Sequence, residues 1–249
     1  MPYPVAAVRN KIMVPSAAVQ TYSQKVLATA SANLLVYFIC GEASGTVMQE
    51  EKNNYDGAYT GVTLGETGIG DGNTCPWWDA ANDYGNIYTA GLAGVFNGAE
   101  GTMAAWFKMN SAAVWADGVQ RYIYRLSADS NNRIDFTKQA VANTLRLRYI
   151  AGAVDDNVSS TTLGATTAWF HLGLTWSVSA DQVIAYINGV QDGATLTGLG
   201  TWAGALGSTV TVFGAATTVP ASVHHGWGAH PAVWSTPLSA SQMLDLATV

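Results

Sequence analysis

The sequence predicts an all-β protein, a sandwich of two antiparallel sheets with an N-terminal arm and a short C-terminal helix. Only 11% of the 249 residues are charged, while 26 are Gly and 9 are Trp, a composition that favours strands and turns. Many short segments alternate apolar and polar residues with a period of two. Turn-forming pairs such as Asp56-Gly57 and Asn188-Gly189 separate these segments.

The clearest element is a hairpin within residues 168–193. Between 170 and 176, large apolar side chains alternate with His171, Gly173 and Thr175, as expected for a strand with one buried face. Residues 182–187 alternate in the same way, and Asn188-Gly189 then provides a tight turn with positive φ angles. We therefore predict two antiparallel strands followed by a turn.

The other elements follow from the same pattern, taken in chain order. Further strands are expected at residues 34–39, 84–88, 101–108, 120–127, 133–138, 143–150, 154–162, 195–199 and 210–213. Residues 41–82 are expected to form a turn-rich loop surface. A short helix is expected before the first strand, and another from the Ser239 cap to residue 246.

One domain over residues 34–249 and an arm over residues 1–33 are predicted. The arm either packs along the domain, reaches a neighbouring molecule, or is a loose terminus.

Six segments, in this order, resemble motifs of one known family. They are Gly-Glu-Ala-Ser-Gly-Thr (41–46), Asn-Tyr-Asp-Gly-Ala-Tyr (54–59), Trp-Asp-Ala-Ala-Asn-Asp-Tyr (78–84), Gly-Thr-Met-Ala-Ala-Trp-Phe-Lys (101–108), the hairpin above, and Trp-Ser-Thr-Pro-Leu-Ser-Ala-Ser-Gln-Met (234–243). Together they resemble the laminin-G-like jelly rolls of the concanavalin A-like lectin/glucanase superfamily. The resemblance spans about residues 34–249 and implies a jelly-roll topology.

No catalytic centre is predicted. The glucanase branch of this superfamily uses two carboxylates on one strand, and retaining hydrolysis needs them ~5 Å apart. The glutamates here are Glu42, Glu50, Glu51, Glu66 and Glu100, and none lies on a predicted strand two residues from another acid. A Gly-x-Ser-x-Gly nucleophile motif is absent from the sequence. We therefore expect a protein that is not an enzyme.

Calcium is the cofactor to consider, because related jelly rolls often hold it at a sheet edge. The candidate ligands are Asp56, Asp79, Asn82 and Asp83. The alternative is that these side chains form turns by binding their own backbone. Cys40 and Cys75 have two alternatives, a single disulfide between them or free thiols. The apolar strand around Cys40 favours a buried free thiol.

Glycan binding would require exposed aromatic rings beside polar groups. The candidates are Trp77, Trp115, Trp202 and Trp227, the first three of which are expected in loops. The alternative for each loop Trp is packing against its own loop. Other tryptophans, Trp106, Trp176 and Trp234, occupy core-like strand positions.

A basic sheet face is predicted on the meander between residues 120 and 150. Its candidates for docking a partner are Arg121, Arg125, Arg146 and Arg148, which oppose apolar residues on their strands. The alternative is a solvated face with charges matched across strands by Asp135.

These observations lead to a functional expectation. The net charge of −6 argues against nucleic acid, and no segment is suited to membrane insertion. With no recognisable export signal, the resemblance implies a virion surface component (phage capsid decoration, fibre or tail) that assembles in the host cytoplasm. It would contact other virion proteins through the arm and basic face, form a homo-oligomer, and bind a glycan. The alternative is a bacterial cell-surface, carbohydrate-binding adhesin module.

Overall fold

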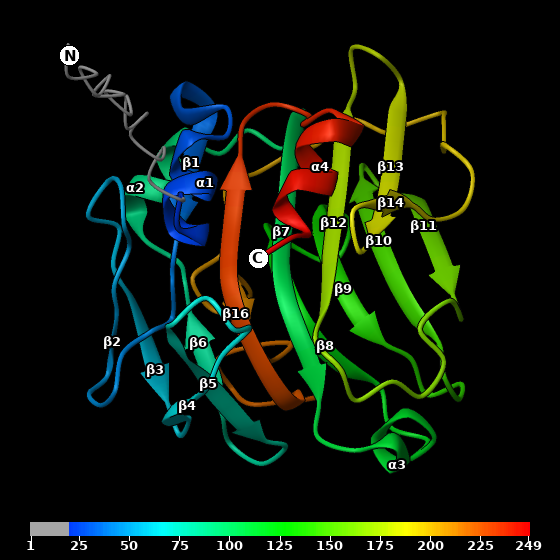
Figure 1. Cartoon of the computed structure of the whole chain (residues 1–249). Coiled ribbons are helices and arrows are strands. Elements are labelled where there is room, and N and C mark those ends of the chain that lie inside the picture. Colours follow the sequence, from blue (N-terminus) through cyan, green and yellow to red (C-terminus); the bar gives the residue numbers. More distant parts are fainter. Residues whose placement is uncertain (1–19) are drawn as a thin grey trace, which may run out of the picture.

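The computed structural model describes residues 20–249, so most of the predicted arm lies outside the described residues. These residues form two stacked antiparallel sheets with short flanking helices, which confirms the predicted sandwich (Figure 1). Sheet 1 has the order β14-β13-β12-β7-β16-β5-β4, with β1 paired to β16. Sheet 2 has the order β11-β10-β9-β8-β15-β6-β3-β2.

The bounds of the elements are as follows. Sheet 1 contains β1 (Leu34–Tyr37), β4 (Thr63–Thr67), β5 (Thr74–Asp79), β7 (Glu100–Met109), β12 (Phe170–Ser177), β13 (Gln182–Ile187), β14 (Val190–Gln191) and β16 (His225–Trp234). Sheet 2 contains β2 (Val47–Met48), β3 (Gly57–Thr60), β6 (Tyr84–Asn86), β8 (Arg121–Ser127), β9 (Arg133–Lys138), β10 (Leu145–Ala151), β11 (Val154–Ser160) and β15 (Val212–Phe213). The helices are α1 (Tyr22–Ala28), a 3-10 turn (Ser31–Asn33), α2 (Ala90–Val95), α3 (Ala112–Trp115) and α4 (Ala240–Leu246).

The main core lies between the sheets and is rich in aromatic rings. Phe107 of β7 meets Phe136 of β9 edge to face at 6.5 Å, and Tyr149 of β10 stacks on Trp176 of β12 at 6.1 Å. All four side chains are buried, as is Cys40. Cys40 and Cys75 are both buried free thiols in the structure.

A second apolar cluster lies on the outer face of sheet 1, where α1 and α4 lie on the same face (Figure 1). Tyr22 of α1 and Met243 of α4 are buried there, and the Tyr22 hydroxyl donates to the Leu246 carbonyl at 2.8 Å. Both helices begin with a capping box, at Thr21 and at Ser239, and the latter confirms the predicted cap. The helices therefore cover one end of this face and leave the other end of β5, β7 and β16 without a helix.

The predicted hairpin is confirmed, with one difference. Asn188 and Gly189 have φ angles of 49° and 76°, as a tight turn requires. However, every residue of β12 is buried, so both of its faces are covered. Gly173 explains this, because its outer side faces the Met243 side chain of α4.

Several predicted boundaries are wrong. Residues 41–82, expected as loops, contain β2, β3, β4 and β5. A strand was expected at Trp234, but the extent of β16 was not predicted, because Gly226, Gly228 and Pro231 interrupt its pattern and a bulge lies between Ala229 and Ala232. Residues 195–199 form a single bridge, Leu196 to Val183, rather than a strand.

Candidate functional site

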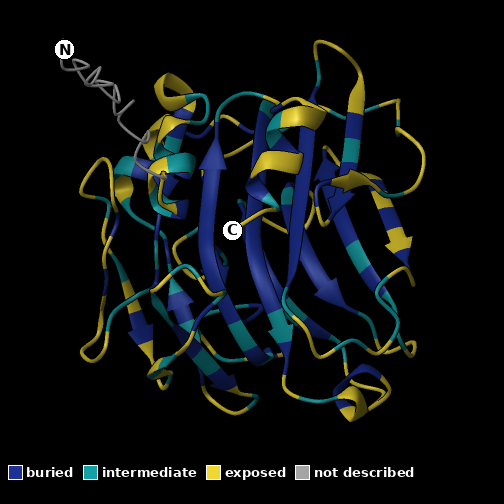
Figure 2. Ribbon diagram, in the orientation of Figure 1, coloured by how far each residue is buried: buried dark blue, intermediate teal, exposed yellow. Residues whose placement is uncertain are grey.

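Two partly exposed tryptophans lie next to each other at the end of sheet 1 that the helices leave open. Trp77 on β5 is directly opposite Trp227 on β16, and their ring centroids are 6.5 Å apart at an angle of 40°. Alternation along β5 turns the neighbouring Trp78 into the core, where it is fully buried. Figure 2 shows intermediate exposure near the ends of β16 and β7 at this site, where His225, Trp227 and Lys108 are intermediate, whereas the middle of both strands is buried. The sheet thus presents an aromatic surface to solvent.

Polar groups surround this aromatic pair. Lys108 of β7 is opposite Trp227 on the other side, with its Nζ atom 4.6 Å from the Trp227 ring centroid. His225 is opposite Asp79, and the Nδ2 atom of Asn110 lies 3.0 Å from the His225 Nε2 atom. We call the six residues Trp77, Trp227, Lys108, Asp79, His225 and Asn110 the tryptophan site.

The tryptophan site also contains an unused donor. The indole Nε1 atom of Trp77 is buried and has no hydrogen-bond partner among the described residues. Burial, and then the charge on Arg121, lower the pKa of His225, so its imidazole is neutral at physiological pH. Ring faces beside an amide, an imidazole, a carboxylate and an ammonium group suit a hydroxyl-rich ligand.

The predicted calcium ligands belong to two separate turns. Asp79 and Asp83 lie between β5 and β6: the Asp79 N–H donates to the Asp83 Oδ2 atom at 2.8 Å, and the Ala81 N–H donates to the Asp79 Oδ1 atom at 2.8 Å. Asn82 is exposed in this turn, while Asp56 accepts from the Glu50 N–H at 2.9 Å elsewhere. Burial and the nearby Asp79 charge raise the pKa of Asp83.

These carboxylates therefore act as turn acceptors. Across residues 20–249, no group of three or more His, Cys, Asp or Glu is placed to hold a metal. Calcium binding by Asp56, Asp79, Asn82 and Asp83 stays a prediction.

The other predicted tryptophans pack inside the protein. Trp115 lies in α3 rather than a loop, is 0% exposed, and donates to the Thr166 carbonyl at 2.7 Å. Trp202 is half-buried, meets Phe96 edge to face at 5.5 Å, and donates to the Gly204 carbonyl at 3.0 Å. The prediction of an exposed Trp115 is wrong. Trp202 bonds to its own loop through its N–H, but its ring packs against Phe96 and Tyr149 of other elements.

The predicted basic face exists on the outer face of sheet 2, but its membership differs. Arg125 and Arg148 flank Asp135 across three strands. A bulge between Tyr122 and Tyr124 moves Tyr122 onto this outer face, where its ring lies 5.3 Å from the Arg125 guanidinium carbon. Tyr122 therefore shares this face with Arg125 instead of opposing it, as strict alternation along the strand would require.

Arg121 is separated from this row. It lies opposite Lys138 at the end of β8, where both side chains pair with Asp117. Its guanidinium also donates to the Val223 carbonyl at 3.0 Å. Arg121 therefore fixes the strand end instead of forming a docking surface with the other predicted arginines.

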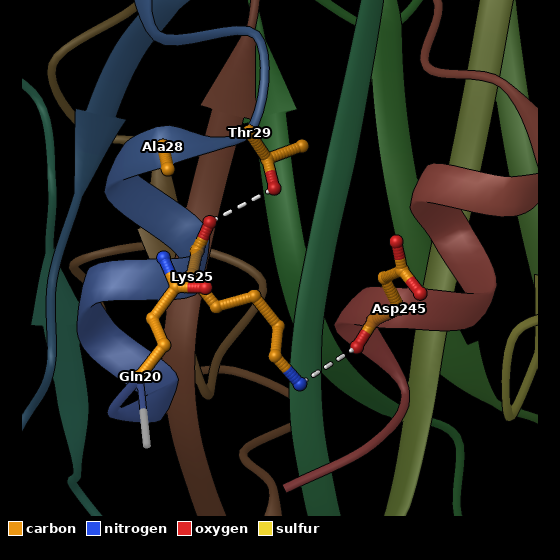
Figure 3. Close-up of a pocket in the computed structure, with 5 residues that line it drawn as sticks. All are labelled: Gln20, Lys25, Ala28, Thr29 and Asp245. Carbon is orange, nitrogen blue, oxygen red and sulfur yellow. Dashed lines mark hydrogen bonds between the residues drawn. The ribbon is translucent and has the colours of Figure 1, made fainter. Parts of the chain in front are cut away.

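A polar cavity lies between α1 and α4 (Figure 3). Lys25 extends across it and donates from Nζ to the Asp245 carbonyl at 3.2 Å and to the Thr248 carbonyl at 2.7 Å. These bonds join the last turn of α4 to α1. Lys25 therefore fills part of this cavity and holds the two helices together.

Comparison with protein families identifies the fold. The family model described as the concanavalin A-like lectin/glucanases superfamily matches residues 79–243. The chain belongs to this superfamily. No curated protein matches the chain in sequence. Within residues 20–249, the superfamily sandwich includes no helix with the length and apolar character needed to cross a membrane.

Solved structures with the superfamily fold are distant in sequence. Domain 4 of AbnA, an extracellular arabinanase from Geobacillus stearothermophilus solved with arabinotriose, is 16% identical with a TM-score of 0.62, over 87% of this chain and 98% of that one. The botulinum neurotoxin serotype D binding domain is 12% identical with a TM-score of 0.62, over 86% and 51%. The binding domain of Paraclostridial Mosquitocidal Protein 1 is 13% identical with a TM-score of 0.63, over 87% and 52%. The chain thus spans about half the length of these two toxin domains.

Sequence reasoning missed Lys108, His225 and Asn110 as members of the tryptophan site. Lys108 was not a candidate, because its contact with Trp227 depends on the pairing of β7 with β16. The pairing of distant strands in the superfamily sandwich is not encoded in local alternation. The alternation of β16 does place His225 and Trp227 on one face, and this was the available signal.

Proposed function

We propose that this chain is a non-catalytic, lectin-like module that binds a glycan at the tryptophan site. The observation that carries the proposal is the cross-strand pair of partly exposed indoles, Trp77 and Trp227, on an end of sheet 1 without a helix. Pyranose rings present a C–H face that stacks on aromatic rings, while their hydroxyls need donors and acceptors. Lys108, Asn110 and Asp79 supply such groups.

The acidic residues support a non-catalytic role. Glu50 is buried and accepts from the Tyr37 N–H at 2.9 Å, and Glu42 accepts from the Gln49 N–H at 2.7 Å. Asp79 belongs to the tryptophan site and Asp83 lies in the same turn, but Asp83 is 4% exposed and already accepts the Asp79 N–H. A glycosidic oxygen needs direct access to its acid, so this pair is poorly suited to hydrolysis.

We further propose a setting on a virion surface, as a decoration, fibre or tail component. Its support is the family resemblance, together with the binding roles named for similar folds: a domain in complex with arabinotriose and two toxin binding domains. Mass spectrometry of purified particles tests this setting, which predicts the chain among the structural proteins. Its presence only in a cell-envelope fraction would contradict the virion and favour an adhesin.

A glycan array with three proteins tests the binding function. The wild-type protein should bind a restricted set of glycans, and Trp227→Ala should lower the affinity at least about tenfold, equivalent to ~1.4 kcal/mol. Trp202→Ala is the matched control, because it removes the same side chain from a packed loop and should leave affinity unchanged. Thermal unfolding of each variant verifies that it is folded.

Two results would contradict the proposal. One is an array on which the folded wild-type protein binds no glycan. The other is hydrolysis of a polysaccharide that is abolished by Asp79→Asn, since a lectin-like module leaves its ligand intact.

A further inference from the structure

A second group of polar side chains lies on the opposite side of the molecule, on the outer face of sheet 2. Strand pairing places Arg125 of β8, Asp135 of β9 and Arg148 of β10 in one row. Arg133 pairs with Asp135 from the same strand, and Arg146 lies two residues before Arg148 on the same side. We call Arg125, Arg133, Arg146 and Arg148 the arginine face.

The positive charge of the arginine face exceeds the negative charge that it contains. Asp135 is 0% exposed, and its Oδ2 atom lies 2.8 Å from the Arg148 NH2 atom and 3.3 Å from the Arg133 Nε atom. The other acidic partner is Asp155, 3.8 Å from Arg148. Arg125 and Arg146 have no salt bridge within the described chain. The arginine face therefore carries a surplus of positive charge, although the whole chain has a net charge of −6.

Several polar atoms of this group are buried without partners. In residues 20–249, neither the Nε atom of Arg125, the Nε atom of Arg146 nor the Oδ1 atom of Asp135 makes a hydrogen bond. Arg125 is 9% exposed and Arg148 is 4% exposed, so these side chains lie flat on the sheet. Burial, together with the neighbouring arginines, lowers the pKa of Arg125 and of Arg146. These buried Nε atoms cannot reach a ligand, and Arg125 already donates to the Ala216 carbonyl and the Ser127 hydroxyl. The guanidinium group that a negatively charged acceptor can approach is therefore that of the half-buried Arg146.

We propose that the arginine face binds an oxyanion group of an acidic polysaccharide, either a sulfate ester or a carboxylate. Guanidinium groups bind such oxyanions through paired N–H donors. Asn157 and Ser159 of β11, both exposed, are opposite Arg148 and Arg146 and supply the neutral groups that sugar hydroxyls need. This site goes beyond the tryptophan site and does not rest on it, because the two lie on different sheets.

A polysaccharide is favoured over nucleic acid by side-chain type. Free Lys side chains, which bind phosphate groups as point charges, are missing from this face within the described residues. The Tyr122 ring beside Arg125 instead offers one aromatic surface next to the cations.

The test compares three polymers at matched ionic strength: dextran sulfate, polygalacturonate and uncharged dextran. Isothermal titration calorimetry with the full chain should detect binding of at least one acidic polymer and no binding of dextran. Binding of dextran sulfate would identify the bound group as a sulfate ester, and binding of polygalacturonate would identify it as a carboxylate. Arg146→Gln should weaken that binding at least about tenfold, because a hydrogen bond to a charged group is lost. Lys52→Gln, which removes the same charge near β1, should leave it unchanged.

A second variant guards against loss of folding. Arg146 is half-buried and its Nε atom bonds to nothing in the described chain, so Arg146→Gln should unfold at the wild-type temperature. Arg146→Lys keeps the charge but loses the planar donor pair, and its affinity should lie between those of the wild type and Arg146→Gln. Equal affinity for dextran and the acidic polymers, absence of binding, or equal weakening by Lys52→Gln would overturn the proposal. Tighter binding of polyglutamate than of either polysaccharide would also overturn it, in favour of an acidic protein partner.

Discussion

Trp77 and Trp227 face each other across neighbouring strands, and the Lys108 ammonium lies 4.6 Å above the Trp227 ring. The three side chains therefore form one row across β5, β16 and β7, held by strand pairing rather than by loop conformation. A row fixed by a sheet changes little when a ligand arrives, which reduces the entropy lost on binding.

The contact between Lys108 and Trp227 should be measurable by itself. In a double-mutant cycle with Lys108→Met and Trp227→Leu, we expect a coupling of about 0.5–1 kcal/mol in the free energy of unfolding, typical of an exposed cation–π pair. Chemical denaturation of the four proteins measures it. Additive effects of the two substitutions would show that the ammonium does not interact with the ring.

The turn after β13 should tolerate no side chain at Gly189. Its φ angle is 76°, and a Cβ atom there would lie 2.6 Å from the Leu244 Cα atom of α4. We expect Gly189→Ala to lower the free energy of unfolding by at least about 1 kcal/mol. Gly94→Ala is the control, because its Cβ atom would meet no atom within 4 Å in α2, and it should be neutral or stabilising.

Acid should destabilise the fold through a buried histidine. Burial lowers the pKa of His171 to about 3, so the folded protein keeps this imidazole neutral while the unfolded chain protonates it near its ordinary pKa. The unfolded state binds more protons between these values. Stability should therefore fall as the pH drops from about 6.5 towards 3, by about 1.4 kcal/mol per pH unit for this one group.

The variant His171→Phe isolates this contribution. Its free energy of unfolding, measured from pH 7 to pH 4, should decline less steeply than that of the wild type by the slope of one proton. His224 keeps its own contribution, because burial also lowers its pKa to about 3. Identical slopes for the two proteins would mean that His171 titrates normally in the fold.

Asp71 should make the free energy of unfolding depend on pH in a lower range than His171 does. Although burial raises its pKa, hydrogen bonds from His230 and Asn73 and the His230 charge hold the pKa of Asp71 at about 2. A depressed pKa stabilises the folded state above the ordinary value near 4, and the effect disappears as the pH falls towards 2. Asp71→Asn should therefore cost about 1 kcal/mol at pH 6, allowing for solvent screening, and almost nothing at pH 2. A cost that is independent of pH would contradict this assignment.

The sequence predicted those elements in which local alternation and tertiary environment agree. Residues 133–138 form β9 as expected, and the hairpin turn at Asn188 has the expected backbone. What alternation could not predict is the coverage of a second face. Gly173 is buried because Met243, seventy residues later, lies over it, and such contacts are set by the packing of α4.

The candidate site was predicted only in part, because it too depends on contacts between residues that are distant in the sequence. Trp227 and Trp77 were candidates by residue type, but their pairing depends on the register of β5 with β16. Trp115 looked equally suitable, yet its indole N–H is bonded to Thr166, a contact between residues 51 positions apart. The bulge before Tyr124 reassigned Tyr122 to the outer face, and a strict period of two cannot include such a shift.

The most direct test of the glycan-binding site is a two-dimensional NMR titration of the indole N–H signals with a glycan selected on the array. Binding at the tryptophan site predicts that the Trp77 and Trp227 signals shift in a saturable manner, while those of Trp115 and Trp202 stay in place. Saturable shifts confined to Trp202, or to none of the indoles while binding is observed by calorimetry, would contradict the account.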